Sequence, residues 1–230
     1  MEPIRLNLQK IPKRTLRQII YDKLKHKIVF GEILPGQVMT LHGLAKEFGV
    51  SLMPVREALW QLESEKIVVI DMNKSIHVNT LTLREMQEAS QLRLMLEARA
   101  AESSCDRITD ADLSRIKHIL DSMEGSLLDP GKYLVLNRQF HLTIYSCADS
   151  PMLLQLINSI WARINPYRHI IVAKFGDPST SMKCHRKIYA ALTKRDKEKL
   201  NRWLHQDLEL ADNLIQKNFG DFIDQGGKRK

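Results

Sequence analysis

Two short amphipathic segments on either side of a glycine constrain this chain more than any other feature. Residues 40–64 read TLHGLAKEFGVSLMPVREALWQLES, with apolar residues at helical spacing before and after Gly49. Glycine ends a helix without steric cost because it adopts the left-handed conformation. Ser51 is a favourable N-cap for the second segment, and Pro54 is tolerated in a first helical turn. The pattern predicts a helix-turn-helix, whose second helix enters the major groove of DNA.

The residues that follow predict a wing. Residues 67–79, IVVIDMNKSIHVN, are rich in β-forming residues on both sides of a polar centre, which is typical of a hairpin. A hairpin directly after a helix-turn-helix forms a wing, and Lys74 near its tip would reach phosphate or the minor groove. A helical hairpin and a β-hairpin without a role in DNA binding remain the alternative at this point.

The charge of the chain favours a polyanionic partner. The formal net charge is +8 and the sequence pI is about 9.4. Residues 1–30 hold eight lysines or arginines, Arg14 among them, against two acidic residues. This basic arm and first helix would attract DNA phosphate and make binding strongly salt-dependent.

Other sequence features indicate a cytoplasmic protein. No stretch approaches the ~20 apolar residues of a membrane helix, and the N-terminus has no apolar signal-peptide core. Three scattered cysteines do not make a disulfide framework, so we expect reduced thiols. No membrane partner is expected.

Only helices are predicted beyond residue 80. Thr82 and Glu85 match a capping box before an apolar-periodic stretch. Prolines and glycines mark the expected helix boundaries and predict six helices, at 82–105, 110–124, 131–148, 151–173, 179–194 and 196–218. The expected fold is therefore mostly α. A winged helix-turn-helix with a basic arm (1–80) precedes an all-α bundle (81–220) and a disordered basic tail (221–230).

Polar residues fall where the interior of this bundle should be. Asn137 and His141 are four residues apart and share one helical face. His185 and His205 lie beside apolar residues in two later helices. Three histidines and an oxygen ligand could converge on a metal ion, since imidazole suits Zn, Ni, Cu, Co or Fe. Spacing alone does not distinguish such ligands from hydrogen-bonded core histidines.

At this point the chain resembles a known family. The run from Pro35–Gly36 through LAKEFGVS to PVREALWQLE is similar to the winged-helix domain of the GntR family of bacterial transcriptional regulators. The rest resembles the FCD ligand-binding domain of the FadR-like subfamily, so the resemblance covers residues 14–217. It implies a transcriptional regulator that binds a palindromic double-stranded operator as a homodimer, and not an enzyme.

The resemblance also implies a metal site and an effector. FCD domains commonly bind a metal through an Asp or Asn, a His four residues later and two further histidines. The matching residues here are Asn137, His141, His185 and His205. A divalent ion, Zn or Ni above all, is the expected cofactor, although Asp is more usual than Asn at the first position.

Two arginines are candidates for binding a small organic-acid effector. FCD domains often present an arginine from their first helix to the cavity, and Arg93 has that place here. A salt bridge with Glu97, one turn further on, is an equally good interpretation of Arg93. Arg163 is the second, weaker candidate.

The recognition helix departs from the family pattern. The usual Ser-Arg-Thr-Pro-Val-Arg start is Ser-Leu-Met-Pro-Val-Arg here, so the first arginine is Leu52. Arg56 is then the remaining guanine reader or phosphate clamp, and the operator should differ from the common site. The expected DNA-contacting residues are Arg56, Ser51, Leu52, Met53, His42, Lys74 and Arg14.

A metal-dependent enzyme that carries a nucleic-acid-binding module is the competing interpretation. Three histidines and an oxygen ligand with open positions on the metal could activate water. The sequence offers no obvious general base beside them and no nucleophile motif, so the regulator is favoured.

Overall fold

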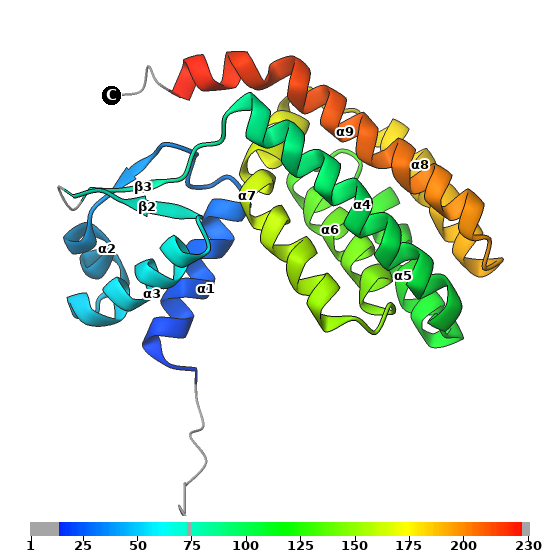
Figure 1. Cartoon of the computed structure of the whole chain (residues 1–230), viewed down its shortest axis with the longest axis horizontal. Helices are drawn as coiled ribbons and strands as arrows, with labels where there is room; N and C mark the ends of the chain where they lie inside the picture. The colour runs from blue at the N-terminus through cyan, green and yellow to red at the C-terminus, as the bar shows by residue number, and fades with distance from the viewer. Residues whose placement is uncertain (1–13, 73–74, 227–230) are drawn as a thin grey trace, which may run out of the picture.

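The computed structural model describes residues 14–72 and 75–226, the last six by their backbone alone. A small N-terminal domain lies against one side of a larger helical bundle (Figure 1). The predicted contacts of Lys74 and of the arm before Arg14 fall outside the described residues.

The N-terminal domain is a winged helix-turn-helix. Its elements are α1 (Leu16–Val29), β1 (Val38–Met39), α2 (Leu41–Phe48), α3 (Leu52–Ser64), β2 (Val68–Ile70) and β3 (Ile76–Val78). The strands form an antiparallel sheet of order β1-β3-β2, with Val69 opposite His77 in the hairpin. The two helices and the hairpin are confirmed, whereas the two-residue strand β1 was not predicted.

The turn between α2 and α3 has the predicted chemistry. Gly49 caps α2 at φ 65°, in the left-handed region. The Thr40 side chain accepts a hydrogen bond from the Gly43 N–H at 3.0 Å and caps the start of α2. Ser51 occupies the N-cap position of α3, but its side chain makes no capping hydrogen bond.

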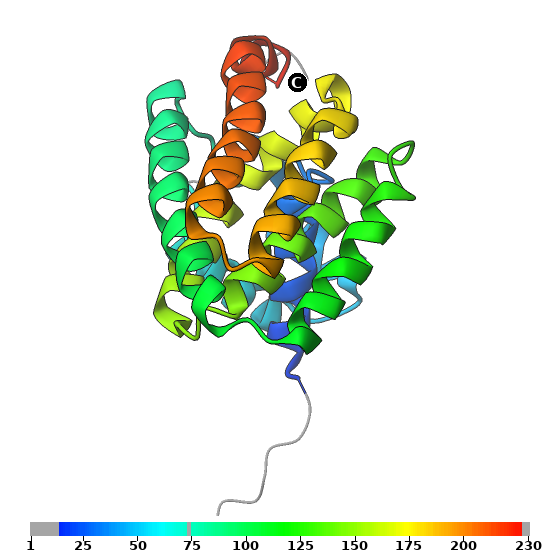
Figure 2. The same cartoon turned by 90° about the vertical axis from the view of Figure 1, so that its right-hand side faces the viewer.

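The bundle contains the six predicted helices, and their ends shift by at most two residues except at the C-terminal end of α9. They are α4 (Leu83–Arg107), α5 (Asp110–Glu124), α6 (Pro130–Ser146), α7 (Pro151–Phe175), α8 (Pro178–Thr193) and α9 (Lys197–Gly226). The capping box of Thr82 and Glu85 is present at the start of α4. Figure 2 shows α4, α9 and α8 next to one another, and both α4 and α8 pack against α9.

The predicted disordered tail starts too early. Helix α9 continues to Gly226, through the first six residues of the stretch 221–230. Its apolar spacing explains this, because Ile215 and Phe219 are buried and Phe222 and Ile223 continue the same spacing in the sequence.

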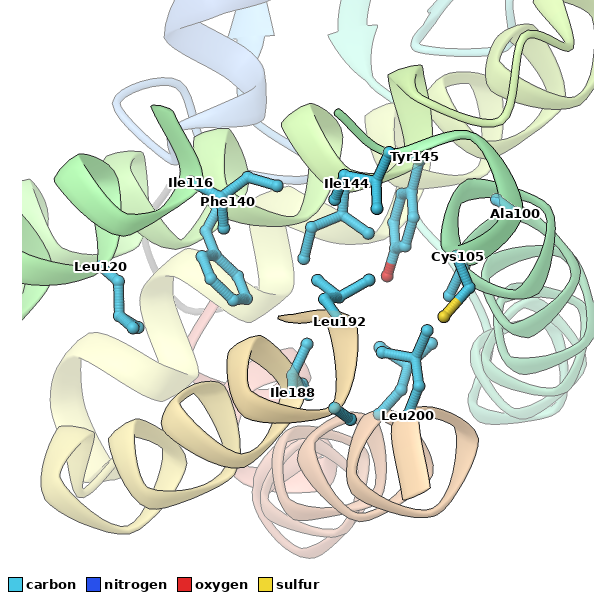
Figure 3. Packing of buried hydrophobic residues seen from close by; sticks show 14 of the residues in the cluster. Ala100, Cys105, Ile116, Leu120, Phe140, Ile144, Tyr145, Ile188, Leu192 and Leu200 are labelled. Carbon is cyan, nitrogen blue, oxygen red and sulfur yellow. The ribbon is translucent and has the colours of Figure 1, made fainter. Parts of the chain in front are cut away.

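A large apolar core fills much of the bundle. Figure 3 shows Phe140, Ile144, Leu192 and Leu200 directed toward one another from α6, α8 and α9. Tyr145 points its hydroxyl group into the same region, next to the buried polar residues of the bundle. No helix within the described ranges is long and apolar enough to cross a membrane.

Helix α7 joins the two domains. Ala162 belongs to the buried core of the N-terminal domain, although it lies in a bundle helix. The N–H of Leu81, in the link to the bundle, donates to the Tyr167 hydroxyl at 2.7 Å. Phe30, just after α1, packs edge-on against His169 with ring centroids 4.8 Å apart. The domains therefore share packing and are not merely tethered.

Replacing Gly49 by alanine tests the turn. A Cβ at this position meets nothing within 4 Å, so the cost is purely the left-handed backbone of a residue with a Cβ. We expect the free energy of unfolding in urea to fall by about 1–2 kcal/mol. Gly125→Ala is the matched control: Gly125 is also a C-cap, but at φ −71°, and should tolerate alanine without loss. Equal stability of the two variants would contradict this account.

Candidate metal centre and DNA-binding face

Three buried side chains from three helices converge in the bundle. His141 of α6, His185 of α8 and Asp207 of α9 form what we call the His–His–Asp cluster. The two histidine Nε2 atoms are 3.2 Å apart, and they lie 3.2 and 3.4 Å from Asp207 Oδ2. All three residues are at most 4% exposed.

Neighbouring hydroxyl groups orient the cluster. The Tyr145 hydroxyl donates to Glu97 Oε2 at 2.7 Å, so it accepts from the Nδ1–H of His141 at 3.2 Å. That hydrogen bond leaves the Nε2 lone pair of His141 directed at Asp207. The Ser181 hydroxyl donates to Asp207 Oδ1 at 2.6 Å and leaves Oδ2 for the cluster.

The charges of the cluster suit a cation. Burial lowers the pKa of His141 and so favours its neutral form. Burial alone would raise the pKa of Asp207, but the neighbouring histidines hold it well below its usual range and keep the carboxylate ionised. Ligand atoms on a tetrahedral zinc ion, bound at about 2.0–2.1 Å, lie about 3.4 Å apart. The observed separations fit such an ion.

One predicted ligand is wrong. The side chain of His205 is 48% exposed, and its Nδ1 lies 3.1 Å from Glu209 Oε2 on the surface of α9. Position 207 shares the inward face with Leu204 and Leu208, whereas position 205 is turned about 100° away from Leu204. The position of Asp207 within the apolar face of α9 is the sequence feature that could have identified it as a buried ligand.

Asn137 lies at the edge of the His–His–Asp cluster, as predicted. Its Nδ2 is 3.2 Å from His185 Nε2, one helical turn before His141. Amide nitrogen and oxygen exchange places by a flip of the side chain, which would present the oxygen to a cation. The four-residue spacing in the sequence is therefore realised as one site.

A second buried cluster adjoins the first. The Glu97 carboxylate accepts from Arg93 Nε at 2.8 Å, Trp161 Nε1 at 2.6 Å and the Tyr145 hydroxyl. Arg93 also donates to Asp212 Oδ1 at 3.2 Å. Burial disfavours the Glu97 charge, but Arg93 outweighs it and lowers the pKa of Glu97. The salt bridge expected as an alternative for Arg93 is therefore present.

Several arginine nitrogens in this region are buried without a partner. Among the described residues they include Arg93 Nη2, Arg138 Nε and Arg168 Nε. The guanidinium of Arg138 lies 5.7 Å above the Trp161 ring. Arg163, the other predicted effector residue, is directed elsewhere: it lies 3.9 Å from Glu85 at the domain boundary and does not face the cluster.

One face of α3 is open to solvent. Arg56 is exposed, and Met53 and Trp60 on the same face are 58% and 55% exposed. Leu52 instead packs against the core of the domain, which argues against its predicted DNA contact.

Three further predicted DNA contacts remain accessible. Ser51 and His42 are exposed. Arg14 is also exposed and lies 3.8 Å from Asp22, a surface pair that contributes little and leaves the arginine available.

Comparison with known proteins identifies the class. The model of the FCD domain matches residues 88–210, and that of the "Bacterial regulatory proteins, gntR family" matches residues 16–78. The chain therefore belongs to the GntR family of bacterial regulators, with an FCD domain as its helical bundle. It is a DNA-binding transcriptional regulator and not an enzyme.

Similar proteins cover nearly the whole chain. The regulator McbR of Escherichia coli K12 is 27% identical over 78% of this chain and 83% of its own length. The repressor RspR of the same organism is 25% identical over 89% and 91%. The solved structure of E. coli McbR/YncC superposes with a TM-score of 0.78 at 25% identity, covering 93% of this chain and 99% of that chain.

Replacing Glu97 by glutamine tests the buried ion pair. We expect the free energy of unfolding at pH 7 to fall by about 3 kcal/mol, since a buried arginine loses its main partner. The pKa of Glu97 is depressed in the folded state, so its contribution is complete above the ordinary glutamate pKa and is lost as pH falls. The variant should therefore lose less stability on acidification than the wild type.

Urea unfolding between pH 7 and pH 3 measures both effects. Glu88→Gln is the matched control, because Glu88 is exposed on the same helix. Similar losses in the two variants would show that the buried pair does not stabilise the fold.

Proposed function

We propose that this regulator senses a small carboxylate at a divalent metal ion bound in the FCD domain. The main support for this proposal is that two imidazole nitrogens and an ionised carboxylate lie within 3.4 Å of one another inside the bundle. A cation among these acceptors would offset their mutual repulsion and the cost of burying the carboxylate. The ion, when bound, supplies a Lewis-acidic position for a carboxylate oxygen.

The donor set favours zinc or nickel. Imidazole nitrogens with one or two oxygen donors suit these borderline ions better than magnesium or calcium, which prefer oxygen alone. His141, His185 and Asp207 would hold the ion, and the Asn137 amide oxygen would complete the protein ligands. Tyr145 and Ser181 fix two of these groups in place through the hydrogen bonds described above.

The exposed face of α3 would enter the major groove of the operator. Arg56 would bind guanine or phosphate, and Met53 has an apolar side chain suited to a thymine methyl group. His42 and Ser51 lie near the same end of the motif, and Arg14 and Lys74 would contact phosphate.

A homodimer would present two such helices to a palindromic operator. The packed helices α4 and α7 supply a surface for a second copy. Their exposed apolar side chains include Leu92, Met95, Met152 and Leu156. This apolar character is unusual for surface helices and supports an isologous contact.

Effector binding would act on DNA through α7. This helix contributes Trp161 to the Glu97 cluster and Ala162 to the core of the N-terminal domain. A change at the metal centre would thus alter the position of the DNA-binding domain and weaken operator binding in the cytoplasm. Repression relieved by an effector fits relatives named as repressors, such as RspR and the gluconate operon repressor of Bacillus subtilis.

Elemental analysis of untagged protein tests the metal centre. We expect about one equivalent of divalent metal in the wild type and none in His141→Ala, His185→Ala or Asp207→Ala, because each variant loses a ligand. His205→Ala is the matched control and should keep the metal, since His205 lies on the surface. Metal lost from the control but kept in Asp207→Ala would reverse our assignment.

Titration of effector against operator tests the regulation. With an operator selected from random duplexes by the full-length protein, a binding carboxylate should weaken operator affinity about 5–150-fold. Operator should weaken carboxylate affinity by the same factor, because coupling between two binding sites is reciprocal. Fluorescence anisotropy and calorimetry measure the two affinities, and independent binding would refute the proposal.

A further inference from the structure

The arginines around the metal centre have more hydrogen-bonding capacity than the protein uses. Arg93 is 1% exposed, yet its Nη2 has no partner while Nε and Nη1 are bound to Glu97 and Asp212. Arg168 Nε is also buried, and among the described residues no hydrogen bond or ion pair is found for this side chain. Unpaired buried donors are costly, so a ligand is the natural partner for them.

Arg168 interacts electrostatically with charged residues of both the His–His–Asp cluster and the Glu97 cluster. Burial and the charge of Arg93 lower its pKa to about 10, while Asp212, Glu97 and Asp207 act in the opposite direction. Arg168 remains cationic at neutral pH despite this shift. It follows Tyr167 on α7, just beyond Pro166, so a ligand bound there would contact the helix shared by both domains.

A bound divalent metal ion would change the sign of the net charge around Arg168. Two guanidinium groups (Arg93 and Arg168) oppose three carboxylates (Glu97, Asp207 and Asp212). His169 adds no charge at neutral pH, because burial and Arg168 lower its pKa to about 4. A bound divalent ion therefore leaves one positive charge without compensation in a largely buried region.

We propose that the effector carries two anionic groups, one bound at the metal and the other by Arg168 together with Arg93 Nη2. This inference rests on the proposed metal-dependent function and adds the class of ligand, a dicarboxylate. A second anionic group supplies the partner that the buried Arg168 lacks, and its guanidinium fork suits bidentate binding of a carboxylate. A monocarboxylate would leave Arg168 unpaired.

Calorimetry with zinc-loaded, full-length protein tests the ligand class. The probes are acids of equal chain length that differ in one carboxylate: succinate against butyrate, and glutarate against pentanoate. We expect at least one dicarboxylate to bind tenfold or more tightly than its monocarboxylate partner. Arg168→Met should reduce this ratio to about one, whereas Lys174→Met, at an exposed position of the same helix, should preserve it.

Each outcome separates this inference from the proposed function. Equal binding of both acids to the wild type, or a preference that survives in Arg168→Met, overturns the dianion and leaves the metal-bound carboxylate intact. Failure of every acid to bind the zinc-loaded protein overturns both.

A measurement without any effector provides a second test. Arg168→Met removes an unpaired buried charge, so the ligand-free, zinc-loaded variant should unfold at a higher temperature than the wild type. Lys174→Met, which removes an exposed charge of the same helix, should not gain stability. A lower unfolding temperature for Arg168→Met would show that Arg168 is already compensated within the protein and would overturn the inference.

Discussion

The buried carboxylate of Glu97 is the interaction on which the rest of the bundle depends. A charge removed from water is costly unless its hydrogen bonds are complete, and Glu97 obtains them from α4, α6 and α7 together. Because the Tyr145 hydroxyl donates to Glu97, it must accept from His141. The same carboxylate therefore fixes the packing of three helices and the direction of a lone pair in the His–His–Asp cluster.

Helix α7 connects this interior to the DNA-binding domain within a few residues. Trp161 donates to Glu97, while its neighbour Ala162 is buried in the core of the N-terminal domain. The Tyr167 hydroxyl accepts the N–H of Leu81 in the link between the domains. A shift of α7 would therefore displace residues in the bundle interior and in the N-terminal domain together, because the helix is closely packed against both. The link formed by residues 79–82 is therefore not the sole connection through which a structural change could reach the DNA-binding domain.

The sequence predicts features that depend on local chemistry and fails where tertiary packing decides. Gly49 and the capping box at Thr82 are local, and the structure has both. The choice between His205 and Asp207 depends on how α9 is rotated against its neighbours. Residue type and spacing in the sequence do not determine that rotation. The unpaired nitrogen of Arg168 depends on groups contributed by distant segments, so neither spacing nor composition could indicate it.

The neutral side chain of Asn137 affects the net charge of the metal-bound site. In a metal-bound cluster, Asp207 would compensate one of the two charges of the ion, and an aspartate at position 137 would compensate the other. The amide of Asn137 compensates neither. The sequence departs from the usual family ligand here, and the same interior holds Arg168 without a counter-ion. Both features place the missing negative charge on the effector, which connects the choice of one ligand to the class of molecule that the regulator senses.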